Sequence, residues 1–283
     1  AIHLKIYLDG LNRRFPSVQV FGYHDDVRLV APPALLLEAL RWSLEVLPTM
    51  SASLQVSKSR LYSPARLPAH LASEFQSHRL PTTTEGLELL GGCIGPDAFV
   101  TRHTRAQEDR HQFLLQEIRA LPQTSLQAAM GLLRWCAGPA HNHSMRLLPP
   151  RHARPHAHRL DDATRATLDY LLGGLDDPTT TAAAHHVRAQ IPLPVKLGGL
   201  GLANKVLMQP AATLATWSLF YRSPLAETPA AARLRQALSQ PSPTATDLTT
   251  QLNAARDQAL NALADDPARA WLSWEVLLDA APP

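Results

Sequence analysis

Two adjacent aspartates, Asp25 and Asp26, are the residues of this chain best suited to chemistry. They lie in residues 21–30 (FGYHDDVRLV), between two runs of β-prone residues. This pattern predicts a tight β-hairpin that displays both carboxylates at its tip or rim. Like charges at contact distance repel unless a cation lies between them, and Mg²⁺ binds through one or two carboxylates together with substrate phosphates. The pair is therefore a candidate site for Mg²⁺ or Mn²⁺, and the alternative is two solvated acids in an ordinary turn.

The segments around this hairpin must position the two carboxylates. Apolar residues at helical spacing predict a helix over residues 2–13, and Pro32-Pro33 predicts the start of a second helix that runs to about residue 47. Residues 64–82 form a polar, weakly patterned connection. We expect a strand, a turn and a second strand over residues 54–62, and a strand interrupted by glycines over residues 86–95.

From Asp97 onward the pattern is helical. The expected helices cover residues 101–120, 125–136, 159–172, 182–190, 205–221, 229–239, 246–264 and 267–280. The sequence therefore predicts an α+β fold, with a small mixed part to about residue 96 and a mostly α-helical remainder.

Composition places the chain among globular proteins, because 45% of its 283 residues are hydrophobic and 18% are charged. Its basic residues are nearly all arginine, whose planar fork suits phosphate contacts, although high genomic GC content gives the same bias. Cys93 and Cys136 are too few for a zinc site or a disulfide framework, so we expect an intracellular chain, in cytoplasm or nucleus, with both thiols packed as small core residues. No signal peptide or membrane span is visible, and the start at Ala1 in helical sequence indicates a piece of a longer product.

Four motifs in order give the chain a resemblance to a known family. They are Tyr23-x-Asp25-Asp26, the lysine segment LQVSKS at residues 54–59, the glycine segment LLGGCIG at residues 89–95, and LPVKLGGLG at residues 193–201. Together with the helical sequence at residues 126–136 and 145–150, this order resembles the reverse transcriptases (RNA-directed DNA polymerases) of non-LTR-type retroelements, over roughly residues 1–220. On that resemblance, residues 1–96 are a partial polymerase palm of β-hairpins with packed helices. Residues 97–150 are a helical thumb-like region, and residues 151–283 are a helical C-terminal region.

The resemblance also implies residue roles and partners. Asp25 and Asp26 would hold Mg²⁺ (or Mn²⁺) for two-metal nucleotidyl transfer to a primer 3′-end, and Tyr23 would pack beside that end. Lys58 would attend the leaving pyrophosphate, for which a flexible ammonium is suited. The primer-grip segment, with Leu90, Gly91, Gly92 and Gly95, would hold the primer, because glycine lets a backbone approach closely. The implied partners are a template with primer, deoxynucleoside triphosphates and the upstream fingers and palm of the same polyprotein, with no membrane partner.

Two departures from the family bear on activity. His24 stands where the family more often has a small or apolar residue, and an imidazole there would lie close to the metals. Two-metal catalysis also needs a third carboxylate from a neighbouring strand, which the family carries upstream of this stretch. Asp9 is the only acid before the hairpin, and we expect it to belong to a turn at a helix C-terminus. The chain thus carries half an active site, and we predict that it does not polymerise alone.

A segment rich in His and Arg, residues 141–159, is the other candidate. His141-Asn142-His143 invites comparison with HNH nucleases, but those residues are not a tripeptide in that family. With no ordered Cys/His spacing for zinc, we interpret the segment as a basic loop between helices, whose Arg151 and Arg154 could contact a duplex backbone. A further pair, Trp271 and Trp274, is expected in a docking or core stripe.

Two alternatives from other classes remain for the function. One is a non-catalytic retroelement remnant, or a helical nucleic-acid-binding or scaffold module that keeps the fold without the chemistry. The other is an unrelated metal-dependent phosphohydrolase that uses Asp25 and Asp26, which would require further carboxylates or histidines converging on the hairpin.

Overall fold

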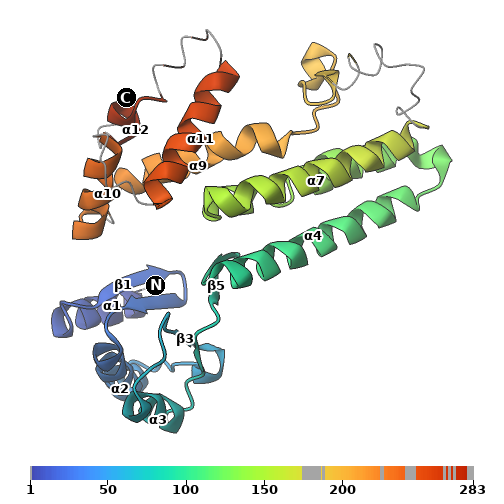
Figure 1. Ribbon diagram of the computed structural model, residues 1–283. Coiled ribbons are helices and arrows are strands. Elements are labelled where there is room, and N and C mark those ends of the chain that lie inside the picture. The colour runs from blue at the N-terminus through green and yellow to red at the C-terminus, as the bar shows by residue number, and fades with distance from the viewer. Residues whose placement is uncertain are drawn as a thin grey trace. The chain divides into compact units, whose positions relative to one another are not determined.

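The protein is mostly helical, with small two-stranded sheets mainly in its N-terminal part (Figure 1). The computed structural model describes residues 2–173, 189–223, 226–239, 247–263 and 272–278, together with residues 186, 266 and 269. The chain divides into two compact units, which are residues 1–88 with 94–99 (unit 1) and residues 89–93 with 100–283 (unit 2). Within the described ranges, no helix combines the length and the apolar character needed to cross a membrane.

Unit 1 is built on a hairpin backed by helices. Its elements are α1 (Ile2–Arg14), β1 (Gln19–Tyr23), β2 (Asp26–Val30), α2 (Pro33–Thr49), the 3-10 turn η1 (Val56–Lys58), β3 (Leu61–Tyr62), α3 (Ala69–Ser77) and β4 (Thr82–Thr83). One core joins α1 and α2 to the inner residues of the hairpin, with Tyr7 stacked on Trp42 at 5.8 Å between ring centroids. The helix predicted over residues 2–13 is confirmed, and so is the helix that starts after Pro32-Pro33.

Two expectations for unit 1 are wrong. The first of the two strands expected over residues 54–62 is absent, because the 3-10 turn η1 begins at Val56. The second corresponds to β3, which pairs in parallel with β4. Residues 64–82 are not merely a connection, because they contain α3. That helix carries the fully buried Phe75, packed with Leu37, Leu40 and Leu61 in a second core. Leu71 and Phe75, four residues apart and both in this core, are too short a pattern to reveal a nine-residue helix from sequence.

The hairpin β5 (Leu87–Leu89) and β6 (Gly92–Ile94) lies where the division between the two units falls. Unit 2 continues with α4 (Asp97–Arg119, with its first residues in unit 1), α5 (Leu126–Leu132), a π-helical turn η3 (Leu133–Ala137), α6 (Asn142–Leu147), α7 (Pro150–Leu171), α9 (Lys205–Tyr221), α10 (Pro229–Ser239), α11 (Asp247–Leu263) and α12 (Trp274–Leu278). The helical remainder predicted from residue 97 is confirmed in these ranges, whereas most of the helix expected at residues 182–190 and part of that at 267–280 lie outside the described residues.

Within unit 2, α9 is the central helix, since it packs against α6, α7, α11 and α12. The helices α4 and α7 lie side by side (Figure 1), and Glu108 meets His156 while Arg119 meets Thr167. Residue numbers rise together along both helices, so the two helices run in the same direction. The core between α4, α5, η3 and α7 contains Leu115, Leu133 and Leu168, all fully buried.

Candidate functional site

The aspartate hairpin has a two-residue turn. Tyr23 pairs with Asp26 across the strands, which leaves His24 and Asp25 in the turn. His24 has a left-handed φ of 54°, as hairpin turns of this length require at their first residue, and histidine is one of the side chains enriched in that conformation. The backbone conformation of the turn therefore accounts for a histidine at this position. Asp25 is exposed at the tip, as predicted, whereas Asp26 is the first residue of β2.

The two carboxylates have different surroundings. Asp26 forms an ion pair with Arg28 at 3.3 Å, because residues two apart on a strand share a face. Both side chains are more than one-third exposed, so the pair contributes about 0–1 kcal/mol to stability. Tyr23 is 61% exposed, and its ring meets His24 edge-on with 4.7 Å between centroids. Asp25 is thus the open carboxylate, and Asp26 already has a cationic neighbour.

The two carboxylates of the hairpin could bind a metal ion only together with ligands from elsewhere. Among the described residues, no group of three or more His, Cys, Asp or Glu side chains is arranged to hold a metal ion. Asp9, the only upstream acid, lies within α1 and is exposed, so the expectation that it belongs to a turn is wrong. Two carboxylates suit a Mg²⁺ ion that also takes phosphate oxygens and waters, but they do not make a complete two-metal centre.

Lys58 lies at the end of η1, not in a turn between two strands. The backbone N–H groups of Lys58 and Ser59 both donate to the Gln55 carbonyl, at 3.0 and 3.1 Å, and the Ser59 hydroxyl donates to the same oxygen at 3.0 Å. These bonds close the backbone into a tight turn, where a strand would have left it extended. The Lys58 side chain is exposed and therefore accessible to an anion.

The second hairpin also has a two-residue turn, formed by Leu90 and Gly91. Both have positive φ, at 49° and 79°, which is the type I′ pattern that normally selects Asn-Gly. Leucine in this conformation is strained, because its Cβ crowds the backbone. His143 on α6 holds the turn from outside, since its Nε2 hydrogen-bonds the Leu90 carbonyl at 2.9 Å.

Two glycines of this segment are explained by packing inside the protein. A Cβ at Gly92 would lie 2.9 Å from the Leu147 side chain, and a Cβ at Gly95 would lie 2.9 Å from the Gly86 Cα. Gly95 therefore requires glycine even without a nucleic acid, because backbone atoms crowd it, whereas a side chain at Gly92 would need only a shift of the Leu147 methyl group. The exposed part of the segment is the turn itself, where Leu90 is 51% exposed.

The His- and Arg-rich segment is helical, so its interpretation as a basic loop is wrong. α6 and the first turns of α7 cover most of it, with Pro149 and Pro150 at the start of α7, where proline is favoured. Pro155 within α7 disguises the helix in the sequence, because proline removes an internal hydrogen bond. Arg151 and Arg154 are nevertheless exposed.

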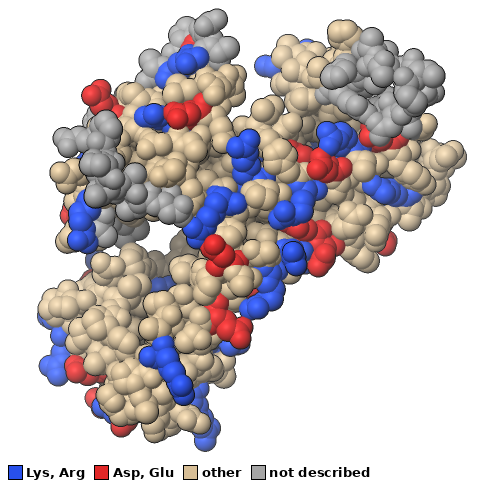
Figure 2. Space-filling model, viewed as in Figure 1, with Lys and Arg blue, Asp and Glu red and all other residues tan. Residues whose placement is uncertain are grey.

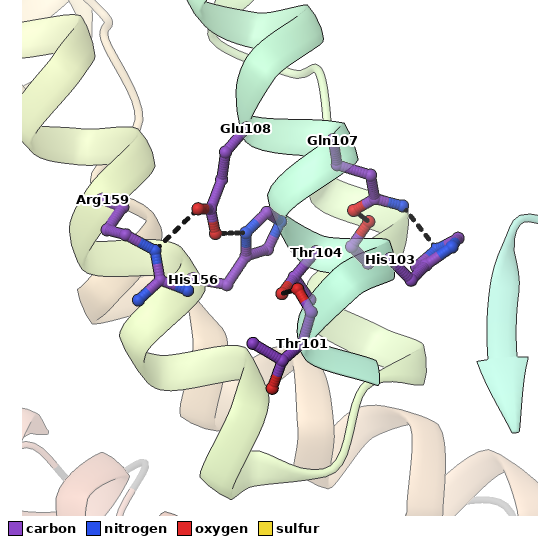
Figure 3. A network of polar contacts seen from close by, with 8 residues as sticks. Thr101, His103, Thr104, Gln107, Glu108, His156 and Arg159 are labelled. Carbon is purple, nitrogen blue, oxygen red and sulfur yellow. Dashed lines mark hydrogen bonds and ion pairs between the residues drawn. The ribbon is translucent and has the colours of Figure 1, made fainter. Parts of the chain in front are cut away.

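A polar network, largely buried except for Arg159, joins α4 to α7 and to α6 through two separate groups of side chains (Figure 3). Glu108 binds His156 Nδ1 at 2.6 Å and Arg159 Nε at 2.8 Å. Gln107, the residue before Glu108, bonds His103 Nε2 at 2.9 Å and accepts from the Ser144 hydroxyl at 2.8 Å. These hydrogen bonds link α4 to α7 and to α6. Unlike apolar contacts, they are directional and fix the orientation of the side chains that they join.

His156 of this network also belongs to a cluster of three neighbouring imidazoles and a lysine. The ring of His141 is 5.3 Å from that of His111 and 5.8 Å from that of His156. Lys205 is 1% exposed and donates to the Gly138 carbonyl at 2.6 Å. Burial, reinforced by the neighbouring cations, lowers the pKa of His111 to about 3 and that of His141 to about 4. Burial also lowers the pKa of His156, against the raising effect of Glu108, and it lowers the pKa of Lys205, against Asp161.

Hydrogen bonding identifies the tautomer of His111. The Thr164 hydroxyl donates to the Leu160 carbonyl at 2.8 Å, so it must accept from His111 Nε2 at 3.1 Å. His111 Nδ1 is then an unprotonated atom, buried with no hydrogen-bond partner in the described part of the chain, and His156 Nε2 is in the same situation. Both rings are thus neutral groups of the core.

Sequence reasoning singled out the segment with His141 and His156, as a loop, but it missed the residues of α4, although a signal exists. His103, Gln107 and His111 recur at i, i+4 and i+8 on the face of α4 that also carries Leu115 and Ile118. Polar residues in phase with apolar ones indicate a buried polar row. The cysteine expectation holds only in part, since Cys93 packs against a small core whereas Cys136 is exposed. Trp274 is buried as expected, and Trp271 lies outside the described residues.

Comparison of the chain with protein-family models, with curated proteins and with solved structures finds no match. What the chain does must therefore be argued from its own residues.

Proposed function

We propose that this chain is the C-terminal palm and thumb part of a retroelement reverse transcriptase, which holds primer and template and supplies two carboxylates of the catalytic metal site. The observation that carries the proposal is the β1–β2 hairpin. Asp25 is exposed at its two-residue turn and Asp26 directly follows, while α1 and α2 pack against the strands. A rigid backing is what a catalytic carboxylate on a short turn needs.

The order of elements supports the same proposal. A helix, the aspartate hairpin, a second helix, the lysine turn η1, the glycine hairpin and the long helix α4 follow one another in the order of the family's motifs. In this proposal Asp25 and Asp26 would bind Mg²⁺ jointly with phosphate oxygens, Lys58 would attend the leaving group, and the Leu90–Gly91 turn would touch the primer. The metal, when bound, would stabilise charge on the transferring phosphoryl group.

Among the described residues no third acid joins Asp25 and Asp26 in a group that could hold a metal, and Asp9 lies within α1, so in this proposal the third carboxylate is supplied by the upstream part of the polymerase. The chain alone therefore binds primer–template and metal but does not extend a primer. A primer-extension signal from the purified chain that is lost in Asp25→Ala would contradict this part of the proposal.

The decisive experiment is calorimetric titration of Mg²⁺ into the purified chain, with and without a primer–template duplex. We expect binding that is tighter with the duplex and lost in Asp25→Asn/Asp26→Asn. Asp9→Asn is the matched control, since Asp9 is an exposed acid of the same unit, and it should bind as the unmodified chain does. Equal binding by all three proteins would remove the metal site from the proposal.

One observation favours a non-catalytic remnant or scaffold as the second candidate. The guanidinium of Arg28 lies 3.3 Å from Asp26, where it partly replaces the cation that two adjacent carboxylates require. In that case Mg²⁺ binding should be absent in the unmodified chain and should appear in Arg28→Gln.

A further inference from the structure

The segment LPVKLGGLG, residues 193–201, is a closed loop of unit 2. The Gly201 N–H donates to the Leu193 carbonyl at 2.9 Å, which closes the loop. Gly198 and Gly201 have left-handed φ values of 81° and 66°, and a Cβ at Gly199 would overlap the Leu193 carbonyl. The closed conformation of the loop thus accounts for its glycines.

This loop forms one wall of an open cavity of about 450 Å³. The cavity is lined by Arg134, Pro192, Pro194, Gly201, Ala203, Asn204, Leu207 and Met208. Among these residues Arg134 alone is charged, and Asn204 is occupied as the N-cap of α9, where it accepts from the Leu207 N–H at 2.9 Å. The volume is within the range of roughly 300–1,000 Å³ that is usual for sites that take small molecules.

Arg134 is held in a defined position at this wall. It lies in the π-helical turn η3, a feature often found at functional sites. Its guanidinium carbon is 4.4 Å from the centre of the Trp135 ring, and the backbone of Gly201 packs so closely that a Cβ there would lie 2.9 Å from Arg134 Nε. Among the described residues, no carboxylate forms an ion pair with Arg134. The site therefore presents a positioned cation with no anion.

Trp135 provides the second half of the recognition surface. Its side chain is 68% exposed, although a tryptophan of a helix is normally buried or hydrogen-bonded. The guanidinium lies over one face of the indole, so a base would stack on the opposite face while the phosphate meets the guanidinium. An aromatic ring together with an arginine is a combination that binds single-stranded nucleic acids. An acidic peptide would use Arg134 equally well but would leave the exposed indole without a planar partner.

We propose that Arg134, Trp135 and the apolar cavity bind one nucleotide unit of a single-stranded nucleic acid, with its phosphate on Arg134 and its base stacked on Trp135. The choice of a nucleic acid as ligand rests on the proposed function. The site would hold an unpaired strand, such as a template overhang. It does not involve the aspartate hairpin.

The test is fluorescence anisotropy of the full chain with fluorescein-labelled oligouridine, in EDTA. Without free divalent metal the aspartate hairpin cannot contribute through Mg²⁺, so failure of the metal site and failure of this site are observed separately. We expect Trp135→Ala to weaken binding about tenfold and Trp135→Phe to weaken it much less, because stacking on one aromatic ring contributes on this scale. Arg134→Gln should weaken binding and flatten its salt dependence.

Phe113→Ala is the matched control, because Phe113 is also exposed (64%) on a helix of unit 2, whereas the ring contact with Arg134 is made by Trp135. It should bind the oligonucleotide as the unmodified chain does. Circular dichroism of each variant checks that the fold is kept. Unchanged binding by folded Trp135→Ala and Arg134→Gln proteins would overturn the proposal, as would a labelled poly-glutamate peptide that binds at Arg134 in place of the oligonucleotide.

Discussion

At the scale of single residues, Glu108 is a position of unit 2 where substitution should be costly for stability. Its carboxylate is the hydrogen-bond partner of a fully buried imidazole, His156, and of the Arg159 guanidinium, and both come from α7. Removing it leaves His156 with a buried Nδ1–H that nothing accepts, and such an unpaired group is costly.

We expect Glu108→Ala to lower the free energy of unfolding by about 2–3 kcal/mol. The measurement is urea unfolding followed by circular dichroism. Glu117→Ala is the control, since Glu117 is an exposed acid of the same helix, and its effect should stay within about 0.5 kcal/mol. Equal effects of the two substitutions would show that the network contributes nothing beyond a surface charge.

The buried imidazoles make unit 2 sensitive to acid. The pKa of His111 in the folded state is about 3 and that of His141 is about 4, against an ordinary value near 6.5. Below pH 6.5 these histidines bind protons in the unfolded chain but stay neutral in the folded chain. The free energy of unfolding is therefore unaffected by them above that pH and decreases as the pH falls toward their folded-state pKa values. The charged groups around the rings are Lys205, Arg110, Arg159 and Glu108, with Asp161 near Lys205.

We therefore expect the free energy of unfolding to fall by about 2–4 kcal/mol between pH 7 and pH 5. In His111→Gln about half of this loss should disappear, because the glutamine amide can still donate to Thr164 and does not titrate. His158→Gln, on an exposed position of α7, should keep the full loss. Identical pH profiles for all three proteins would mean that the imidazoles do not control acid stability.

At the scale of elements, the β5–β6 turn depends on α6. Leu90 is in a strained left-handed conformation, and the bond from His143 to its carbonyl is the external tie that offsets the strain. Without it we expect the turn to open more often and its amides to exchange faster.

The prediction is that His143→Ala speeds hydrogen exchange in residues 89–93 about tenfold, which corresponds to the loss of roughly 1.4 kcal/mol from one hydrogen bond. His143→Gln should restore protection, because its Nε2 reaches about as far as the imidazole Nε2, whereas the shorter His143→Asn should not. If all three variants exchange like the unmodified chain, His143 does not hold the turn.

The same elements show what sequence can and cannot predict. The aspartate hairpin and α9 were predictable because a strong local pattern, turn residues or helical spacing, coincides with the tertiary environment. The start of α7 was not, because Pro155 and several histidines oppose a helix locally and only packing against α4 and α6 makes the helix favourable. For the candidate site, the sequence located Asp25 at a hairpin tip, and the i, i+2 spacing on a strand also predicts that Arg28 lies beside Asp26. It could not reveal that His143 hydrogen-bonds Leu90, since these residues are 53 positions apart.

At the scale of the whole molecule, charge is balanced. The formal net charge is only +3, and on the face shown in Figure 2 basic and acidic side chains alternate along the part where α4 and α7 lie. In the proposed function, nucleic acid would therefore be held by particular arginines and not by a continuous basic field.

Arg151 and Arg154, exposed in the first turns of α7, are two such candidates. Arg151→Glu/Arg154→Glu should weaken duplex binding at low salt and reduce the slope of log K against log salt by about 2, because each phosphate contact contributes about 0.9. Filter binding over a salt series measures this slope. Arg233→Glu, on an exposed position of α10, should change it little, and a double variant that behaves like this control would exclude α7 from the interface.

The π-helical turn at Leu133–Ala137 has a consequence for how this chain tolerates length changes. Such a turn accommodates one residue more than an α-helical turn, and here it ends the helix that begins with α5, directly before the turn at Gly138. Deleting Cys136, an exposed residue of the turn, should therefore be accommodated locally by a return to α-helical spacing, whereas a deletion in the middle of α4 or α7 rotates every later residue of that helix by about 100°. This chain should accordingly tolerate a change of length at the end of α5 and not within its two long helices.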